Sequence, residues 1–178
     1  MIKNCISTFN DSYNSHELKK FLLDIQKEDF FQTSKWRNPP HWHVTKLFLG
    51  GNKSLRNDPI LLNFKENDLV SIDLQGFIYV PDKIITCICF PDSEVKNKIP
   101  HLTIMTNEWK PKESNTVCEA LFIDEVFKKE YETVFKNRDY KEEFIECLNI
   151  KVGNEKVDVY LMKLSPAIHF EGITKYFL

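Results

Sequence analysis

Apolar side chains recur along this chain at two spacings, and the spacing separates expected helices from expected strands. Residues 15–25 and 124–137 carry apolar side chains three and four positions apart, as one face of a helix does, and Ser15 suits an N-cap. The remaining apolar segments are short or alternate with polar residues and are bounded by turn-forming residues, which is typical of strands. These expected strands cover residues 2–9, 43–50, 68–80, 84–90, 101–106, 144–152 and 157–164, with the tail 167–178 as a further candidate.

Short turns between neighbouring strands indicate the fold class. Residues 81–83 (Pro-Asp-Lys) separate one pair of strands, and residues 153–154 (Gly-Asn) separate another. Gly and Asn readily adopt turn conformations, and such short connections join antiparallel strands. We therefore expect an α+β protein rather than a doubly wound parallel sheet. In the strand 68–80, Val70, Ile72 and Leu74 alternate with polar residues, which predicts that only one face is buried.

Two of the expected strands begin with the same tripeptide pattern, His-Val-Thr at 43–45 and His-Leu-Thr at 101–103. Because side chains alternate across a strand, each motif projects its imidazole and its hydroxyl on one face. Two such strands side by side would offer one base, one acid and two hydrogen-bond donors to a single phosphodiester. Imidazoles suit both acid and base roles because their ordinary pKa is about 6.5. The pattern indicates phosphodiester chemistry that requires no metal and no cofactor.

The surroundings of both motifs resemble a known superfamily, the two-histidine (2H) phosphoesterases, which are defined by paired His-x-Thr/Ser motifs. Residues 43–50 (His-Val-Thr-Lys-Leu-Phe-Leu-Gly) match the first motif, and residues 100–104 (Pro-His-Leu-Thr-Ile) match the second. The short separation and residues 110–115 look most like the cyclic phosphodiesterase domains of RNA-repair enzymes. Lys46 departs from the apolar residue usual at its position.

This resemblance implies a pseudo-twofold fold with two small antiparallel sheets forming a V-shaped cleft and helices outside. It also implies a phosphodiesterase that acts on RNA ends or nucleotides and opens a 2′,3′-cyclic phosphate to a phosphomonoester. His43 and His101 would be the acid–base pair, and the hydroxyls of Thr45 and Thr103 would hold the non-bridging oxygens. Related members that cleave 2′,5′-oligoadenylates or cyclic oligonucleotides remain an alternative within the same fold.

Four further residues are candidates for substrate contacts. Trp109 and Lys110 follow the second motif strand, where base stacking and phosphate attraction would be useful, although a large aromatic also commonly packs over the end of a sheet. Tyr79 could reach the cleft from the hairpin around residues 81–83. His41 lies two residues before His43 and would share its strand face.

The composition of the chain limits the classes of binding partner and the compartment that we expect. We expect a single domain over residues 1–178, with 42% hydrophobic residues and no linker. A net charge of −2 argues against binding of long duplexes and favours an RNA 3′ end or a small nucleotide. Five cysteines without a Cys-x-x-Cys pair fit a reducing compartment. No apolar run approaches membrane-spanning length, so we expect a cytoplasmic or nuclear monomer that does not bind membranes.

Two functions of other classes fit parts of the same pattern. His41, His43 and His101, with Glu108, could ligate a metal in a cupin-like enzyme. That reading leaves both threonines unexplained, and activity in the presence of strong chelators would exclude it. A non-catalytic RNA-end binder could also retain both motifs, and measuring turnover beside binding would separate it from an enzyme.

Overall fold

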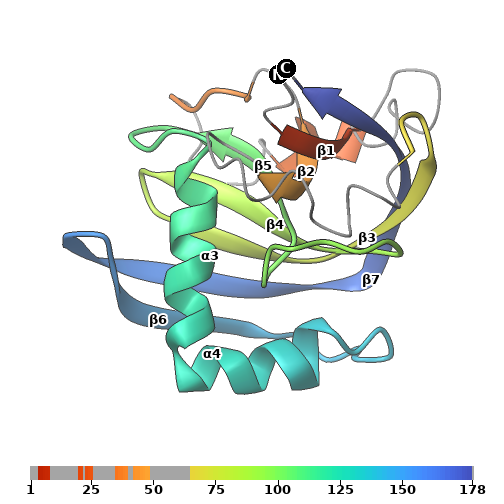
Figure 1. The fold of residues 1–178 in the computed structure, drawn as a ribbon. Coiled ribbons are helices and arrows are strands. Elements are labelled where there is room, and N and C mark those ends of the chain that lie inside the picture. The colour runs from red at the N-terminus through yellow and green to blue at the C-terminus, as the bar shows by residue number, and fades with distance from the viewer. Residues whose placement is uncertain are drawn as a thin grey trace.

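A computed structural model describes residues 4–8, 20–21, 23–25, 35–39, 42–48 and 65–177 of the chain. Within these residues the strands form one antiparallel sheet in the order β1-β2-β5-β4-β3-β7-β6 (Figure 1). The strands are β1 (Asn4–Thr8), β2 (His43–Phe48), β3 (Leu69–Val80), β4 (Ile84–Pro91), β5 (His101–Thr106), β6 (Ile145–Val152) and β7 (Glu155–Phe177). β1 also pairs with the end of β7, so every strand except β6 belongs to a closed ring.

The α+β class is confirmed, but the expectation of two small sheets flanking a V-shaped cleft is wrong for the described strands. The reason is β7, which runs for 23 residues without a break. Its first part pairs with β6 and β3, and its last part pairs with β3 and then β1. The expected strand 157–164 and the expected tail strand 167–178 are therefore one strand. Because this strand pairs with β6, β3 and β1, it joins them in a single sheet.

Among the residues described, three consecutive helical segments cover one face of this sheet. α3 (Glu113–Ile123) crosses the strands, and α4 (Glu125–Glu130) continues into the π-helical turn η3 (Tyr131–Phe135) beside β6 (Figure 1). The expected helix 124–137 is confirmed, and the Asp124 side chain caps it by accepting a 2.9 Å hydrogen bond from the backbone N–H of Phe127. Of the expected helix 15–25, residues 20, 21 and 23–25 are described and helical. No described helix has the length and apolar character to cross a membrane.

α3 was not anticipated from the sequence. Its buried side chains Val117, Cys118 and Leu121 do have helical spacing. The segment nevertheless begins with Lys-Pro-Lys and continues through four polar residues at 113–116, so its apolar stripe is short and weak. This omission matters because α3 contributes to the candidate site.

Apolar residues pack on both faces of the sheet. Val44 and Leu102 belong to one buried cluster, while Val117 and Leu121 of α3 belong to the second cluster on the other face. Because both faces are covered, β3 is buried almost throughout, contrary to the expectation of one solvated face.

The burial of β3 also depends on a register shift between Leu74 and Gly76. Val70, Ile72 and Leu74 share a cluster as predicted, but after the shift the residues of opposite parity, Phe77 and Tyr79, join that same cluster. An extra residue in one strand reverses the alternation of side chains, as a β-bulge does. The shift therefore decides which way Tyr79 points.

Candidate active site

The two motif strands are neighbours in the sheet. β2 and β5 are antiparallel, and Val44 of one pairs directly with Leu102 of the other. Both side chains are buried in the same apolar cluster. The residues that flank each of them must then point to the opposite face of the sheet, because successive strand side chains alternate.

We call the four flanking residues the motif quartet: His43, Thr45, His101 and Thr103. The antiparallel register set by the central pair places His43 opposite Thr103 and Thr45 opposite His101. The two imidazoles thus occupy one diagonal of a small rectangle, and the two hydroxyls occupy the other. Diagonal neighbours on such a face lie roughly 7–8 Å apart, which leaves room for a phosphate between two rings. The structure therefore brings both sequence motifs together on one surface.

His101 is held in one tautomer by the backbone. Its Nδ1 lies 2.8 Å from the carbonyl oxygen of Ile99. A carbonyl can only accept, so Nδ1 carries the proton and Nε2 presents a lone pair when the ring is neutral. Burial lowers the pKa of His101, and the charge of His43 lowers it further, while the Ile99 carbonyl and Glu119 act in the opposite direction. The lowered pKa therefore favours a neutral His101 at neutral pH, with its Nε2 lone pair held in one orientation.

The influence of His43 on the pKa of His101 agrees with the position of the two imidazoles on one diagonal of the quartet. His43 is only half-buried, whereas His101 is 9% exposed. Water can therefore solvate a positive charge on His43 better than one on His101. The two imidazoles thus have different environments, and burial disfavours a positive charge more strongly at His101.

Thr103 is supported by the first turn of α3. Its Oγ1 lies 2.7 Å from Oγ of Ser114, which is completely buried, and 3.4 Å from the carbonyl oxygen of Pro111. Ser114 is a site residue that the motif pattern did not reveal. No local pattern in the sequence marks it, because its partner Thr103 lies in a different element.

The loop before β5 lies across β2 and ties the two motif strands together. The backbone N–H of Lys96 donates to the carbonyl of Lys46 at 2.8 Å, and the Asn97 amide donates to the carbonyl of Thr45 at 3.4 Å. The same loop supplies the Ile99 carbonyl that orients His101. The loop therefore touches the backbone or side chain of both motifs.

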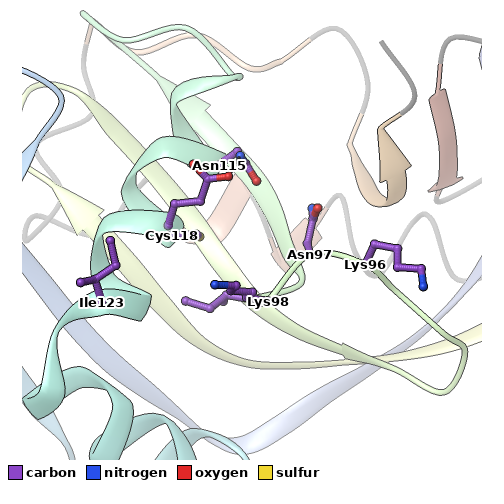
Figure 2. A pocket seen from close by; sticks show the side chains of 8 residues that line it. Lys96, Asn97, Lys98, Asn115, Cys118 and Ile123 are labelled. Carbon is purple, nitrogen blue, oxygen red and sulfur yellow. Dashed lines mark hydrogen bonds between the residues drawn. The ribbon is translucent and has the colours of Figure 1, made fainter. Parts of the chain in front are cut away.

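A pocket of about 390 Å³ opens between this loop and α3 (Figure 2). Ile99 lines the pocket and also holds His101, so the pocket adjoins the motif quartet. Glu119, which acts on the pKa of His101, lines it from the helix. The lining residues are Lys96, Asn97, Lys98, Ile99, Asn115, Cys118, Glu119 and Ile123.

Tyr79 does not join the quartet. It is 6% exposed and belongs to the cluster that contains Val44 and Leu102, on the other face of the sheet. Its ring centroid lies 6.0 Å from those of Trp36 and of Tyr160. The register shift in β3 is the physical reason, because it turns Tyr79 from the face of the sheet that carries the quartet to the opposite face.

Trp109 has partners at the end of β5 remote from His101. Its indole N–H donates to Glu155 at 3.0 Å, and Nζ of Lys83 lies 5.4 Å from its ring centroid. These contacts support packing over the end of the sheet. Lys110 is exposed and adjoins Pro111, whose carbonyl oxygen lies near Thr103.

The alternative metal set is only partly described. His41 lies outside the described residues. Glu108 forms an ion pair with Lys83 at 2.8 Å, beside Trp109. Over the described part of the chain, no group of three or more His, Cys, Asp or Glu side chains is arranged to hold a metal ion.

Comparisons with known proteins identify the fold. No protein-family model and no curated protein matches the chain. The fold is similar to that of a solved structure, the crystal structure of a fungal RNA kinase, with a TM-score of 0.63 and 13% sequence identity. The likeness covers 100% of this chain and 46% of that chain, so this protein spans about half of the other's length. The two chains therefore share a fold over the whole of this one.

Proposed function

We propose that this protein is a metal-independent phosphodiesterase of the two-histidine type that acts on RNA ends or nucleotides. Its most suitable substrate is a 2′,3′-cyclic phosphate, which it would hydrolyse to a phosphomonoester. The observation that supports this most strongly is the motif quartet, in which each imidazole stands opposite the other motif's hydroxyl. The fold shared with a fungal RNA kinase supports an RNA substrate.

In the proposed reaction, His101 is the base and His43 is the acid. Nε2 of His101 takes a proton from water while the water oxygen forms a bond to phosphorus. The bond from phosphorus to one ribose oxygen breaks, and His43 gives its proton to that oxygen. The protons then redistribute through solvent, which restores a neutral His101 and a protonated His43.

The environments of the two rings support this assignment of roles. Burial and the Ile99 carbonyl favour a neutral His101 with its Nε2 lone pair available. His43 is more open to water, where a positive charge is less costly. Thr45 and Thr103 would donate hydrogen bonds to the non-bridging oxygens and stabilise the charge that develops on them.

A substrate panel with product analysis tests the proposal. It contains nucleoside 2′,3′-cyclic monophosphates, an RNA oligonucleotide ending in a 2′,3′-cyclic phosphate, 2′,5′-oligoadenylate and cyclic dinucleotides, each with and without a strong chelator. We expect turnover of the cyclic phosphates to a phosphomonoester, with equal rates in chelator. Turnover confined to 2′,5′-oligoadenylate or cyclic dinucleotides would show that these alternatives, and not 2′,3′-cyclic phosphates, are the substrates. Binding without turnover of any substrate would identify a non-catalytic RNA-end binder, and loss of activity in chelator would favour the metal enzyme.

A further inference from the structure

The pocket between α3 and residues 96–99 supplies neither the acid nor the base of the reaction described above. Resting on the proposed function, we propose that this pocket binds the nucleotide that precedes the cyclic phosphate. The preferred substrate would then be the 3′ end of an RNA strand rather than a mononucleotide.

The pocket shares its wall with the motif quartet. Ile99 lines it and holds His101 through its backbone carbonyl. Asn97 also lines it, and its side chain donates to the backbone carbonyl of Thr45. The pocket therefore lies next to the quartet, and in this proposal the nucleotide before the terminal phosphate occupies it.

The size of the pocket suits one nucleotide. Its volume is about 390 Å³. Sites for small molecules commonly have volumes of roughly 300–1,000 Å³, so this pocket lies at the lower end of that range. It can take one nucleotide but not a longer segment of RNA.

The lining offers the kinds of group that a nucleotide needs. Lys98 extends from the loop, with its Nζ 5.0 Å from the ring centroid of Phe122, and it can attract the phosphate that links the last two nucleotides. Asn115 donates to Oε1 of Glu119 at 2.8 Å, so the pair offers its remaining polar atoms to base edges and to a 2′-hydroxyl. The buried side chains of Ile99 and Cys118 give a base an apolar surface.

Lys98 is the better lysine to test. Lys96 is 3.2 Å from the carboxylate of Glu94, which offsets part of its charge. Figure 2 shows Lys98 between the loop and the helix, beside Ile123 and Cys118, while Lys96 extends away from them. The local charge at the pocket is therefore set mainly by Lys98 and Glu119.

The experiment compares kcat/KM for a nucleoside 2′,3′-cyclic monophosphate with kcat/KM for a trinucleotide that ends in the same cyclic phosphate. The variants are Lys98→Ala and Lys98→Glu, and Lys151→Ala on β6 is a matched control because Lys151 is also exposed. We expect the wild type to prefer the trinucleotide. Lys98→Ala should lower that preference about fivefold, the upper range for an exposed ion pair, and Lys98→Glu should lower it further. The slope of log kcat/KM against log salt for the trinucleotide should become shallower by about 0.7 in Lys98→Ala.

A second variant, Asn115→Trp, fills the pocket from an exposed helix position and should also reduce the preference, with circular dichroism as the test of folding. Equal kcat/KM for both substrates in the wild type overturns the inference and leaves the proposed function standing. An unchanged preference in all the pocket variants overturns it too. Failure of the wild type to open either cyclic phosphate removes the proposed function and this inference together.

Discussion

Removing the Ser114 hydroxyl tests how α3 supports the motif quartet. Ser114 is completely buried, and its Oγ lies 2.7 Å from Oγ1 of Thr103. Ser114→Ala leaves the Thr103 hydroxyl with only the Pro111 carbonyl, at 3.4 Å. That distance is long for a hydrogen bond between a hydroxyl and a carbonyl. Thr103 should therefore lose its preferred orientation without losing its place in β5.

Ser114→Ala should cause a moderate loss of stability and a moderate loss of kcat, which can be measured separately. Removing the hydrogen bond between Ser114 and the part-buried Thr103 hydroxyl costs about 1–2 kcal/mol of folding stability. For a protein of this size, that corresponds to a fall in Tm of about 3–6 °C. Complete loss of a donor to a developing oxyanion costs about 3 kcal/mol, so a donor that is present but poorly aimed should cost about half of that. We expect kcat for the cyclic phosphate to fall about tenfold.

A double-mutant cycle with Thr103→Ala decides whether Ser114 acts through Thr103. In the Thr103→Ala background, Ser114→Ala should have little further effect on kcat, because the hydroxyl that it orients is already gone. Thr116→Ala is the matched control, since Thr116 lies in the same helix and donates to Glu113 at 3.1 Å. If Ser114→Ala slows both backgrounds by the same factor, Ser114 does not act through Thr103.

The lowered pKa of His101 should place the acid limb of the kcat/KM profile below the ordinary histidine value of about 6.5, because protonation removes the base; a midpoint at or above that value contradicts a buried base. The unfolded chain takes up this proton at higher pH than the folded one, so the contribution of His101 should make the protein less stable as pH falls below about 6.5. Thermal unfolding of wild type and His101→Ala at pH 7.5 and 5.5 can measure this contribution. Gly76→Ala should cost about 3 kcal/mol and lower Tm by about 6–12 °C, because a Cβ would meet Phe135 at 2.6 Å and the carbonyl oxygen of Met162 at 2.7 Å. Gly153→Ala is the control: Gly153 has a φ of +61°, and an added Cβ would meet nothing within 4 Å, so the substitution should cost only about 1 kcal/mol. Equal Tm values for the two variants would refute the predicted steric clash at Gly76. Overnight dialysis against a strong chelator should leave turnover of the cyclic phosphate unchanged, and a rate restored by added metal would contradict the metal-independent scheme.

Local pattern was sufficient to locate the motif strands. β2 and β5 begin at His43 and His101, where the sequence pattern starts them, and β6 and β7 meet at the expected Gly153 turn. These features depend on neighbouring residues only, because strand alternation and turn chemistry are local properties. The prediction that each motif projects His and Thr on one face follows from the same alternation.

Features that depend on distant parts of the chain were not predictable in this way. Direct pairing of Val44 with Leu102 and closure of the ring by β1 and β7 are long-range contacts, so no local pattern specifies them. The orientation of Tyr79 was missed because one inserted residue near Gly76 reverses the strand's parity. Ser114 was missed because its partner, Thr103, lies in a different element.

Single-turnover hydrolysis of an RNA 2′,3′-cyclic phosphate by wild type, His43→Ala and His101→Ala tests most directly whether the two imidazoles act on one phosphorus. Each substitution should lower the rate constant by about 10²–10⁴, the usual contribution of a positioned acid or base, while circular dichroism stays unchanged. The double variant should be little slower than either single one, because both act in the same step. A folded variant that retains near wild-type turnover would exclude that histidine from the chemistry and contradict the account.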